Sequence, residues 1–507
     1  MDYFDIFCLQ FFVVFIIYLI KRPQIGKNEP PLVPYRYPII GHTYRYLYDA
    51  ENLINECKEK YGDPFSLYIF GSVRTFAGAD SSHEVFQNSP DIFDHHTAIN
   101  VLFPVHEVYR QYLIHEDAPA FSAHSINESI NGRIYLYTSR IQKDLLFGIE
   151  KYFGDCKGSK RIKNIHDVLS LIIAKPIVNV FLGEEAAQFD DIVESFSGLE
   201  KDVFKLKAIP PILLFIHPSL HKKAVTLPLK LGWKPINKHR DLFIRRFKLI
   251  VEERVRQRIV LGKKYILKDD LLDFVLSEPD FKTEVVDDKF LDKLFGIIYA
   301  NAFAAVHSTT RFLAMTLFEY GGRPEFWKEI YEEQLMIHNE INNNLEADNV
   351  NKMIKLECFI KESFRNSSDF ASLPHALLKD SYTFKNGATI PKGRIVNICT
   401  KDVTLSSNFY GETSKNFQPS RHITTYSGGT TIHAPLSKVD KGHIAFGGGR
   451  RACPGRFLAT HILKIFMHNL VLRYNIRTKS GKVDPKKIIA TFVFQPTSEL
   501  IFENRNY

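Results

Sequence analysis

The chain has 507 residues, of which 45% are hydrophobic and 24% charged, and its formal net charge is +9. These fractions are ordinary for a globular protein, and the length is enough for a large core. The positive charge is spread along the chain, without the dense basic blocks interleaved with aromatic residues that mark nucleic-acid binding. The composition therefore excludes nucleic acid as a partner and favours anionic surfaces or acidic proteins.

The N-terminal segment predicts a membrane anchor over residues 1–22. The stretch FDIFCLQFFVVFIIYLI, from Phe4 to Ile20, is almost wholly apolar, and Lys21 and Arg22 follow it. Its length is at the low end of the roughly 17–25 residues that span a bilayer, which suits a thin membrane such as the endoplasmic reticulum. The basic residues come after the segment, and it has no small-residue cleavage site. We therefore expect an uncleaved single-pass anchor with the rest of the chain in the cytosol.

Residues 23–40 hold five prolines, which forbid helix and stiffen the chain, so we predict a hinge between the anchor and a globular body over residues 41–507. Alternating short segments from Pro64 to Ala79 indicate a small sheet. Helical periodicity dominates from residue 125 to residue 365. The apolar, proline-broken stretch 208–233 is either a loop that touches a membrane or lines a channel, or a plain surface connection.

The segment from Asp287 to Gly322 is apolar nearly all round and predicts a helix that runs through the core. Asp287 or Asp288 can cap its start, and Gly321 and Gly322 can end it. A helix of this length spans roughly 50 Å. The charged residues inside it exclude a second membrane span.

The cysteines are scattered and form no CxxC pair, which argues against a disulfide framework and against a zinc site of the paired-cysteine kind. The six are Cys8, Cys57, Cys156, Cys358, Cys399 and Cys453.

Three further stretches carry candidate functional residues. KLECFIKESFR places Glu362 and Arg365 at i and i+3 on one side of a predicted helix. NFQPSRH supplies Arg421 in a proline-kinked loop, and FGGGRRACPG then sets Cys453 among glycines and arginines. A single cysteine so placed is either a buried structural thiol or a ligand.

With its anchor, proline hinge, long central helix, E-x-x-R helix, P-x-R loop and cysteine loop in this order, the chain resembles the cytochrome P-450 family of heme-thiolate monooxygenases. The cysteine loop is the most specific part of the resemblance. All five positions of F-x-x-G-x-R-x-C-x-G are filled, by Phe446, Gly449, Arg451, Cys453 and Gly455.

The resemblance implies a mainly α fold, a large helical domain with a minor β-sheet region, preceded by a single transmembrane helix. It also implies a heme b cofactor with Cys453 as the axial ligand of the iron, since a thiolate ligand favours O–O cleavage. Gly449 and Gly455 would let the backbone turn tightly and aim amides at the sulfur. Phe446 would pack beside the sulfur, and Arg451 would pair with a heme propionate.

The resemblance also assigns residues outside the cysteine loop. Glu362, Arg365 and Arg421 resemble the family's buried triad, which is a structural ion network and not a catalytic one. The tryptophan and arginine that often bind a propionate before the central helix are not visible, and Arg110 is a weak substitute. Ten residues past Arg365, where a propionate-binding arginine is common, this chain has His375.

The central helix departs from the family's A-G-x-[DE]-T pattern. The aligned residues, Ala304 to Thr309, read AAVHST, so that Ala305 replaces glycine, His307 the acid and Ser308 the threonine. A histidine at this place resembles sterol 14α-demethylases and certain fungal diterpene oxidases; a lone histidine on an apolar helix is otherwise a core residue. We expect Ser308 and His307 to relay protons, with Thr309 as the fallback hydroxyl.

We therefore expect a microsomal monooxygenase that inserts one oxygen atom from O2 into a hydrophobic substrate, with sterols or terpenoids favoured and fatty acids next. Electrons would come from NADPH through NADPH-cytochrome P-450 reductase, with cytochrome b5 as another donor. One alternative is a heme-thiolate isomerase or dehydratase that rearranges peroxides without reductase; another is a catalytically silent heme or lipid-binding protein. The residues expected to face the substrate are Phe303, Ala304, Phe370, Ala371 and Leu373.

Overall fold

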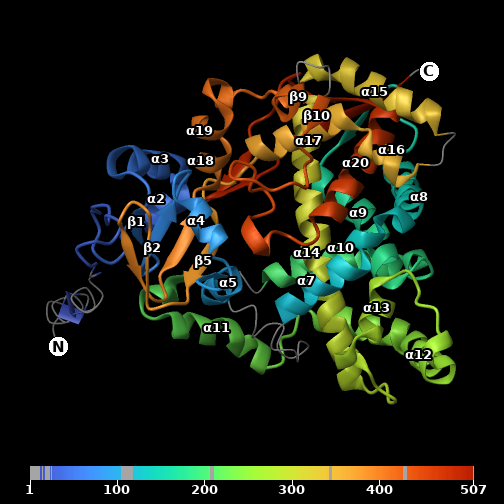
Figure 1. Cartoon of the computed structure of the whole chain (residues 1–507), viewed down its shortest axis with the longest axis horizontal. Helices are drawn as coiled ribbons and strands as arrows, with labels where there is room; N and C mark the ends of the chain where they lie inside the picture. The colour runs from blue at the N-terminus through green and yellow to red at the C-terminus, as the bar shows by residue number, and fades with distance from the viewer. Residues whose placement is uncertain are drawn as a thin grey trace, which may run out of the picture.

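The computed structural model describes residues 12–13, 15–16, 23, 25–103, 118–205, 211–341, 345–425 and 431–505. A helical body makes up most of the molecule, and the largest sheet lies at one side of it (Figure 1). The fold class is thus mainly α with small sheets, as predicted.

The bounds of the elements follow. The α-helices are α2 (Thr43–Tyr48), α3 (Ala50–Tyr61), α4 (Ser82–Gln87), α5 (His95–Leu102), α7 (Ala118–Ser129), α8 (Ile134–Tyr152), α9 (Ile165–Leu182), α10 (Asp190–Lys205), α11 (Pro218–Lys230), α12 (Asn237–Leu261), α13 (Leu271–Ser277), α14 (Asp288–Gly321), α15 (Trp327–Glu340), α16 (Ala347–Asn351), α17 (Ile354–Asn366), α18 (Thr400–Thr404), α19 (Ser407–Tyr410) and α20 (Arg456–Arg473). The strands are β1 (Phe65–Ile69), β2 (Ser72–Ala77), β3 (Phe93–Asp94), β4 (Lys160–Ile162), β5 (Ser372–Leu377), β6 (Ser381–Thr383), β7 (Thr389–Pro391), β8 (Ile395–Ile398), β9 (Ile423–Thr425), β10 (Thr431–His433), β11 (Tyr474–Thr478), β12 (Lys487–Ile489), β13 (Phe492–Phe494) and β14 (Leu500–Asn504).

The central helix forms where the sequence predicts it. α14 has 34 residues, and the carboxylate of Asp287 caps it by accepting a hydrogen bond from the Phe290 amide at 2.8 Å. It packs against α9, α10 and α17, and most of its C-terminal half is buried. Because apolar residues cover nearly every face, the helix is stable only inside the body, where it forms the axis of the main core.

The main sheet has five strands in the order β1-β2-β8-β5-β3, with β2 and β8 parallel and the other pairs antiparallel. The hairpin of β1 and β2 is the one predicted between Pro64 and Ala79. Phe65 and Phe76 are cross-strand partners whose rings stack at 5.5 Å. Helix α4 contacts the cysteine loop, and His375 of strand β5 packs on Phe86 of α4, so the sheet lies close to this loop.

Part of the predicted hinge is attached to the sheet. The Val33 amide donates to the Ser66 carbonyl at 2.9 Å, and the Ser66 amide donates to the Pro31 carbonyl at 2.9 Å. Val33 is buried, and Glu29 forms an ion pair with Arg394. From residue 29 onwards the proline-rich segment therefore packs as an extra edge of the body.

The membrane predictions concern two segments. Most of the predicted anchor lies outside the described residues; within it, Phe12, Val13, Phe15 and Ile16 are helical and exposed. In the described part of the chain, α9 alone is long and apolar enough to cross a membrane, but it is mostly buried and packs against α8 and α14. Its composition is therefore that of a core helix.

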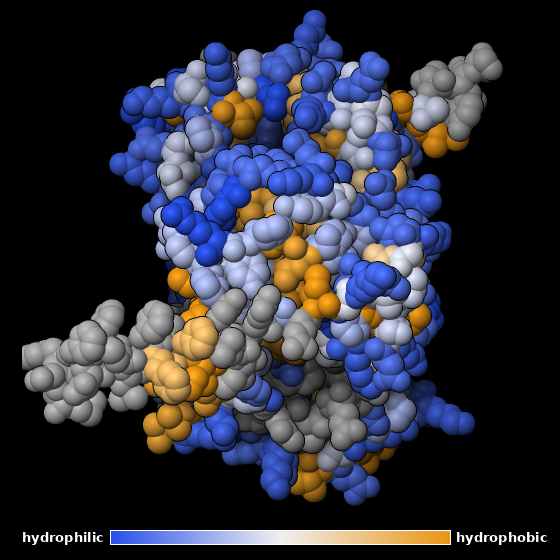
Figure 2. Space-filling view, turned by 90° about the vertical axis from the view of Figure 1, so that its left-hand side faces the viewer, coloured by the Kyte–Doolittle hydropathy of each residue, from blue (hydrophilic) through white to orange (hydrophobic). Residues whose placement is uncertain are grey.

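The described part of the apolar stretch 208–233, which begins at residue 211, contains a 3₁₀ turn (Pro211–Phe215) and α11. Phe215 contacts the ring of Phe70, so this stretch covers the turn between β1 and β2. Apolar atoms reach the surface on this side of the molecule (Figure 2). The exposed apolar residues of this stretch are Ile212, Ile216, Leu220, Leu227, Leu231 and Trp233.

Candidate active site

The cysteine loop holds Cys453 between a 3₁₀ turn (Gly449–Arg451) and the start of α20. Its amide donates to the carbonyl of Phe446 at 2.8 Å, which closes the loop. Burial raises the pKa of the Cys453 thiol, and the amides of Gly455 and Arg456 oppose this by facing the sulfur. The residue is nonetheless exposed, while the other described cysteines are buried and free. An accessible sulfur that faces amides at a helix N-terminus is a good thiolate ligand for a metal.

Helix α4 lies so close to the cysteine loop that two positions of the loop must be glycine. Gly449 has φ +63°, and a Cβ there would lie 2.1 Å from the carbonyl oxygen of Phe86. A Cβ on Gly448 would lie 2.8 Å from the Phe86 ring. The loop can approach α4 this closely only without side chains. Phe86 is therefore a member of the site that no sequence signal indicated.

An aromatic path joins the central helix to this loop. Phe312 of α14 stacks on Phe364 of α17 at 4.2 Å, and Phe364 contacts the ring of Phe446 at 5.9 Å. Ser308 lies one turn before Phe312 on α14. The exposed face of α14 that holds Ser308 is thereby fixed relative to the loop that holds Cys453.

The predicted proton-relay residues lie on different faces of α14. Ser308 and Ala304 are exposed, and the Ser308 hydroxyl donates to the Ala304 carbonyl at 2.6 Å. Thr309 is buried, so the open face carries the Ser308 hydroxyl and not that of Thr309. His307 points to α10, where its Nδ1 lies 2.7 Å from Oε1 of Glu200. The ring of Phe303 lies against His307 at 5.8 Å.

Glu200 and a second histidine were missed by sequence reasoning. Burial alone would raise the pKa of Glu200, but the adjacent His307 holds it below its ordinary value. Burial lowers the pKa of His166, which lies beside the pair. Both residues lie more than 100 positions before His307 in the sequence, so only the packing of α9, α10 and α14 brings the three together.

The residues present fit a flat apolar cofactor with a thiolate ligand. Ala304 and Ser308 give α14 a small, exposed face, and Cys453 is the exposed sulfur. His375 is buried with its ring against Phe86 at 5.5 Å, so it lies close to the cysteine loop. This face of α14 would cover a heme, the Cys453 sulfur would ligate its iron, and His375 would lie near its propionates.

Burial lowers the pKa of His375 and of the adjacent His95, which favours the neutral form of both rings. Burial lowers the pKa of His375 to about 4, and its Nδ1 donates to the Leu373 carbonyl at 2.8 Å. His95, which the sequence did not indicate, contacts the His375 ring at 5.3 Å. Arg451 is exposed, and among the described residues it forms no ion pair. Arg110 lies outside the described residues.

The E-x-x-R helix and the P-x-R loop meet in one buried network. Arg365 donates to both carboxylate oxygens of Glu362, at 2.8 and 2.7 Å, and Arg421 donates to Oε1 at 3.1 Å. His422 also binds the carboxylate, through Nε2 at 2.9 Å, and the Gln418 amide donates to it at 2.8 Å. The network fastens α17 to the segment just before the cysteine loop.

The structure places three of the residues predicted to face the substrate beside the main sheet or within it. Phe370 and Ala371 are buried in the cluster that packs on β1 and β2, and Lys401 covers the Phe370 ring at 4.2 Å. Leu373 is half-buried with φ +49° at the start of β5. Ala304 is exposed and Phe303 half-buried, so the five residues predicted to face the substrate differ in exposure, and that role stays a prediction.

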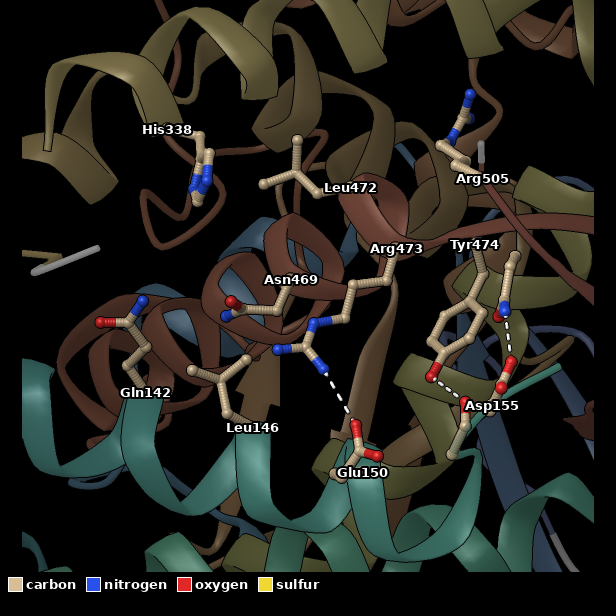
Figure 3. Close-up of a pocket in the computed structure, with 12 residues that line it drawn as sticks. Gln142, Leu146, Glu150, Asp155, His338, Asn469, Leu472, Arg473, Tyr474 and Arg505 are labelled. Atoms are coloured by element: carbon tan, nitrogen blue, oxygen red, sulfur yellow. Dashed lines mark hydrogen bonds and ion pairs between the residues drawn. The ribbon is translucent and has the colours of Figure 1, made fainter. Parts of the chain in front are cut away.

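A separate hollow of about 690 Å³ lies beside α8, α15 and α20 (Figure 3). Its lining includes Arg473, which pairs with Glu150 at 3.3 Å, and Tyr474, whose hydroxyl donates to the Gly154 carbonyl at 2.6 Å. None of the predicted site residues lines it. The hollow is therefore distinct from the cysteine loop and its surroundings.

A mainly helical fold with an exposed cysteine at the start of a late helix is the arrangement expected of a heme-thiolate protein. The profile of the family described as Cytochrome P450 matches residues 30–502, so the chain belongs to this family. Members of the family bind heme b and incorporate oxygen, and the protein is accordingly a heme-dependent monooxygenase.

Similar proteins are fungal. Cytochrome P450 monooxygenase olcJ of Penicillium canescens is 24% identical over 74% of this chain and 68% of its own length. Cytochrome P450 monooxygenase 71 of Postia placenta is 24% identical over 96% of both chains. Lanosterol 14-alpha demethylase of Candida tropicalis is 22% identical over 95% of this chain and 92% of its own length.

Proposed function

We propose that the protein inserts one oxygen atom from O2 into a hydrophobic substrate at the face of α14 exposed by Ala304 and Ser308, with Cys453 as the axial ligand. Heme, when bound, supplies the oxygen activation, which a thiolate ligand favours. The observation that carries the proposal is the aromatic path from Phe312 through Phe364 to Phe446, because it ties that helix face to the cysteine loop. Glu362 and its arginines act as structural supports of the loop.

Ser308 and His307 deliver protons in this proposal. When one atom of O2 enters the substrate and the other is reduced to water, two protons are consumed, and they need a positioned donor in a site that excludes water. The Ser308 hydroxyl can donate and accept at once. The His307 side chain is 23% exposed and that of Glu200 17%, so the pair forms a link between the exposed face of α14 and solvent. An imidazole has two ring nitrogens, one of which can accept a proton while the other donates, which suits this position.

The test is the yield of product and of hydrogen peroxide per NADPH consumed. Ser308→Ala keeps substrate binding but diverts electrons to peroxide, since the hydroxyl that donates the proton is lost. Thr309→Ala is the matched control, because that hydroxyl is buried one position along the same helix. Full coupling in Ser308→Ala, together with uncoupling in Thr309→Ala, would contradict the assignment.

For the substrate we propose a sterol or terpenoid first and a fatty acid next. The surroundings of His307 are aromatic, with the Phe204 ring at 5.4 Å and the Phe303 ring at 5.8 Å, and suit a rigid apolar molecule. One similar protein is named for a sterol, lanosterol. A panel of sterols, terpenoids and fatty acids, scored by the ligand-induced spin-state change of the heme, tests the class. Product formed from peroxides without NADPH would instead indicate an isomerase or dehydratase, and binding without product a silent heme protein.

For electrons we propose NADPH-cytochrome P-450 reductase, or cytochrome b5, docking beside the cysteine loop. Lys438, Lys441 and Arg451 are exposed there and suit an acidic partner. Arg450 contributes less, because Asp91 pairs with it. Salt should therefore slow reduction of the heme by the reductase, measured by stopped flow.

For localisation we propose the endoplasmic reticulum membrane, with residues 1–22 as a single-pass anchor, residues 23–40 as the connection and residues 41–507 in the cytosol. The exposed helical residues Phe12 and Phe15 support an anchor. The exposed apolar side chains of α11 support a second, peripheral contact with lipid.

A further inference from the structure

A group of three metal-ligating side chains lies where α9, α10 and α14 pack together. It consists of His166 near the start of α9, Glu200 in α10 and His307 in α14. One ring nitrogen of each histidine and one oxygen of the carboxylate all lie within 4.8 Å of one another. All three side chains are half-buried.

We propose that His166, Glu200 and His307 form a binding site for a divalent transition metal ion, best met by Zn²⁺. Two imidazoles and one carboxylate are a ligand set that zinc takes with water in its fourth position. The site uses no cysteine, so the scattered cysteines of the chain do not bear on it. The proposal concerns an ion distinct from the heme iron.

The distances between the three ligand atoms suit tetrahedral coordination of an ion after small side-chain rotations. Zinc–nitrogen and zinc–oxygen bonds of the usual length set tetrahedral ligand atoms about 3.4 Å apart. Here the closest pair, Nδ1 of His307 and Oε1 of Glu200, is 2.7 Å apart, and the widest separation is within 4.8 Å. The closest pair of ligand atoms must move apart and the widest pair must move together, which rotation of the Glu200 side chain about its own bonds can supply.

The contact between His307 and Glu200 leaves a ligand atom available. The two atoms are close, but Nδ1 of His307 is buried without an aligned hydrogen-bond partner among the described residues. An imidazole nitrogen that faces a carboxylate without an aligned hydrogen bond can take a cation between them. The neighbouring residues do not oppose this, because Lys201 pairs with Asp167 at 3.1 Å and is partly neutralised.

The partial exposure of the ligand side chains and the rigidity of their surroundings also agree with a metal site. The His307 and Glu200 side chains are 23% and 17% exposed, so an ion can reach the buried Nδ1 of His307 once the Glu200 side chain rotates away from it. The aromatic rings of Phe204 and Phe303 wall the His307 ring and limit its rotation. A site on three packed helices keeps its ligands in place better than one on loops.

The consequence for turnover rests on the proposed function, whereas ion binding does not. A zinc ion on His307 would occupy the imidazole that links Ser308 to solvent. Micromolar zinc should then lower product formation and raise the peroxide released per NADPH, while leaving substrate binding unchanged.

The experiment measures zinc on the full-length, heme-loaded protein in detergent after removal of adventitious metal with a chelator. Equilibrium dialysis against ZnCl₂, with zinc and heme quantified in the same sample, should give one tightly bound zinc per heme. His166→Ala and Glu200→Ala should each weaken that binding by at least roughly tenfold, since even second-shell changes have effects of this size. His124→Ala is the control: it removes a histidine from another histidine–glutamate contact, His124 with Glu278 at 3.4 Å.

The outcomes test the zinc site and the role of His307 in proton delivery separately. Wild-type zinc affinity in both His166→Ala and Glu200→Ala, or equal weakening in the control, overturns the site. Loss of zinc in either variant, with the reduced carbon monoxide spectrum of a folded heme-thiolate protein retained, supports it. If zinc binds as proposed but turnover in its presence matches turnover in chelator, the site stands and the role of His307 in proton delivery is refuted.

Discussion

Replacing Glu362 with glutamine should destabilise the folded chain and deplete its heme. The carboxylate is fully buried and holds two arginines and a histidine, with Arg365 itself almost fully buried. Glu362→Gln removes the negative charge and leaves the Arg365 cation to three backbone carbonyls. Breaking one partner of a buried ion pair costs about 3–5 kcal/mol.

The pKa of Glu362 gives a similar magnitude. Burial alone would raise this pKa, but the hydrogen bonds from Arg365 and His422 outweigh it and lower the pKa from 4.5 to about 2. That difference corresponds to about 3 kcal/mol of stability, a large share of the roughly 5–15 kcal/mol of a typical domain. Because the folded pKa is depressed, this stability is present above the ordinary value of 4.5 and is lost as the pH falls towards 2.

The assay is urea unfolding of the purified full chain, followed by heme absorbance and by circular dichroism, with heme content measured at expression. Glu253→Gln is the matched control, since Glu253 and Arg256 form the same i,i+3 pair on an exposed helix face. Glu362→Gln should lower the unfolding midpoint and heme content, and the difference from wild type should shrink as the pH is lowered from 5 towards 3, below the ordinary 4.5. Soluble, heme-replete Glu362→Gln with the wild-type midpoint would refute the reasoning.

Three further outcomes are expected. Cys453→His should retain some heme but lose the red-shifted carbon monoxide band of a thiolate ligand, whereas Cys399→Ser, which changes a buried thiol, should keep it; a retained band in the first variant would exclude that ligand. Gly449→Ala should lower heme content sharply, because its Cβ would meet backbone at 2.1 Å and a left-handed alanine costs about 1 kcal/mol more. Gly411→Ala, with φ +69° and open space around it, should have only the conformational cost, so equal losses would disprove the packing argument. Deleting residues 1–22 should release much of the protein from microsomes on carbonate washing without loss of heme, and loss of heme binding would show that this segment belongs to the core.

The sequence alone determined the features that depend on neighbours along the chain. The central helix was predicted because a capping aspartate, Asp287, precedes an unbroken apolar run and glycines end it, and α14 has those bounds. The spacing of Glu362 and Arg365 places them on one helix face whatever surrounds the helix. The cysteine loop could be recognised in the sequence because several glycines close together indicate backbone conformations that other residues rarely adopt. Gly449 has such a conformation, with φ +63°.

The tertiary structure decided which distant side chains meet. Phe86 lies more than 300 positions before the glycines that it forces to lack a Cβ, and nothing in its local sequence marks it. His166 and Glu200 join His307 only because three helices pack together. Phe370 is one of the residues predicted to face the substrate, and the structure buries it, since burial depends on what the fold places over a residue. Local geometry depends on the spacing of residues that are close in the sequence, whereas contacts across the core depend on the free energy of packing the whole chain.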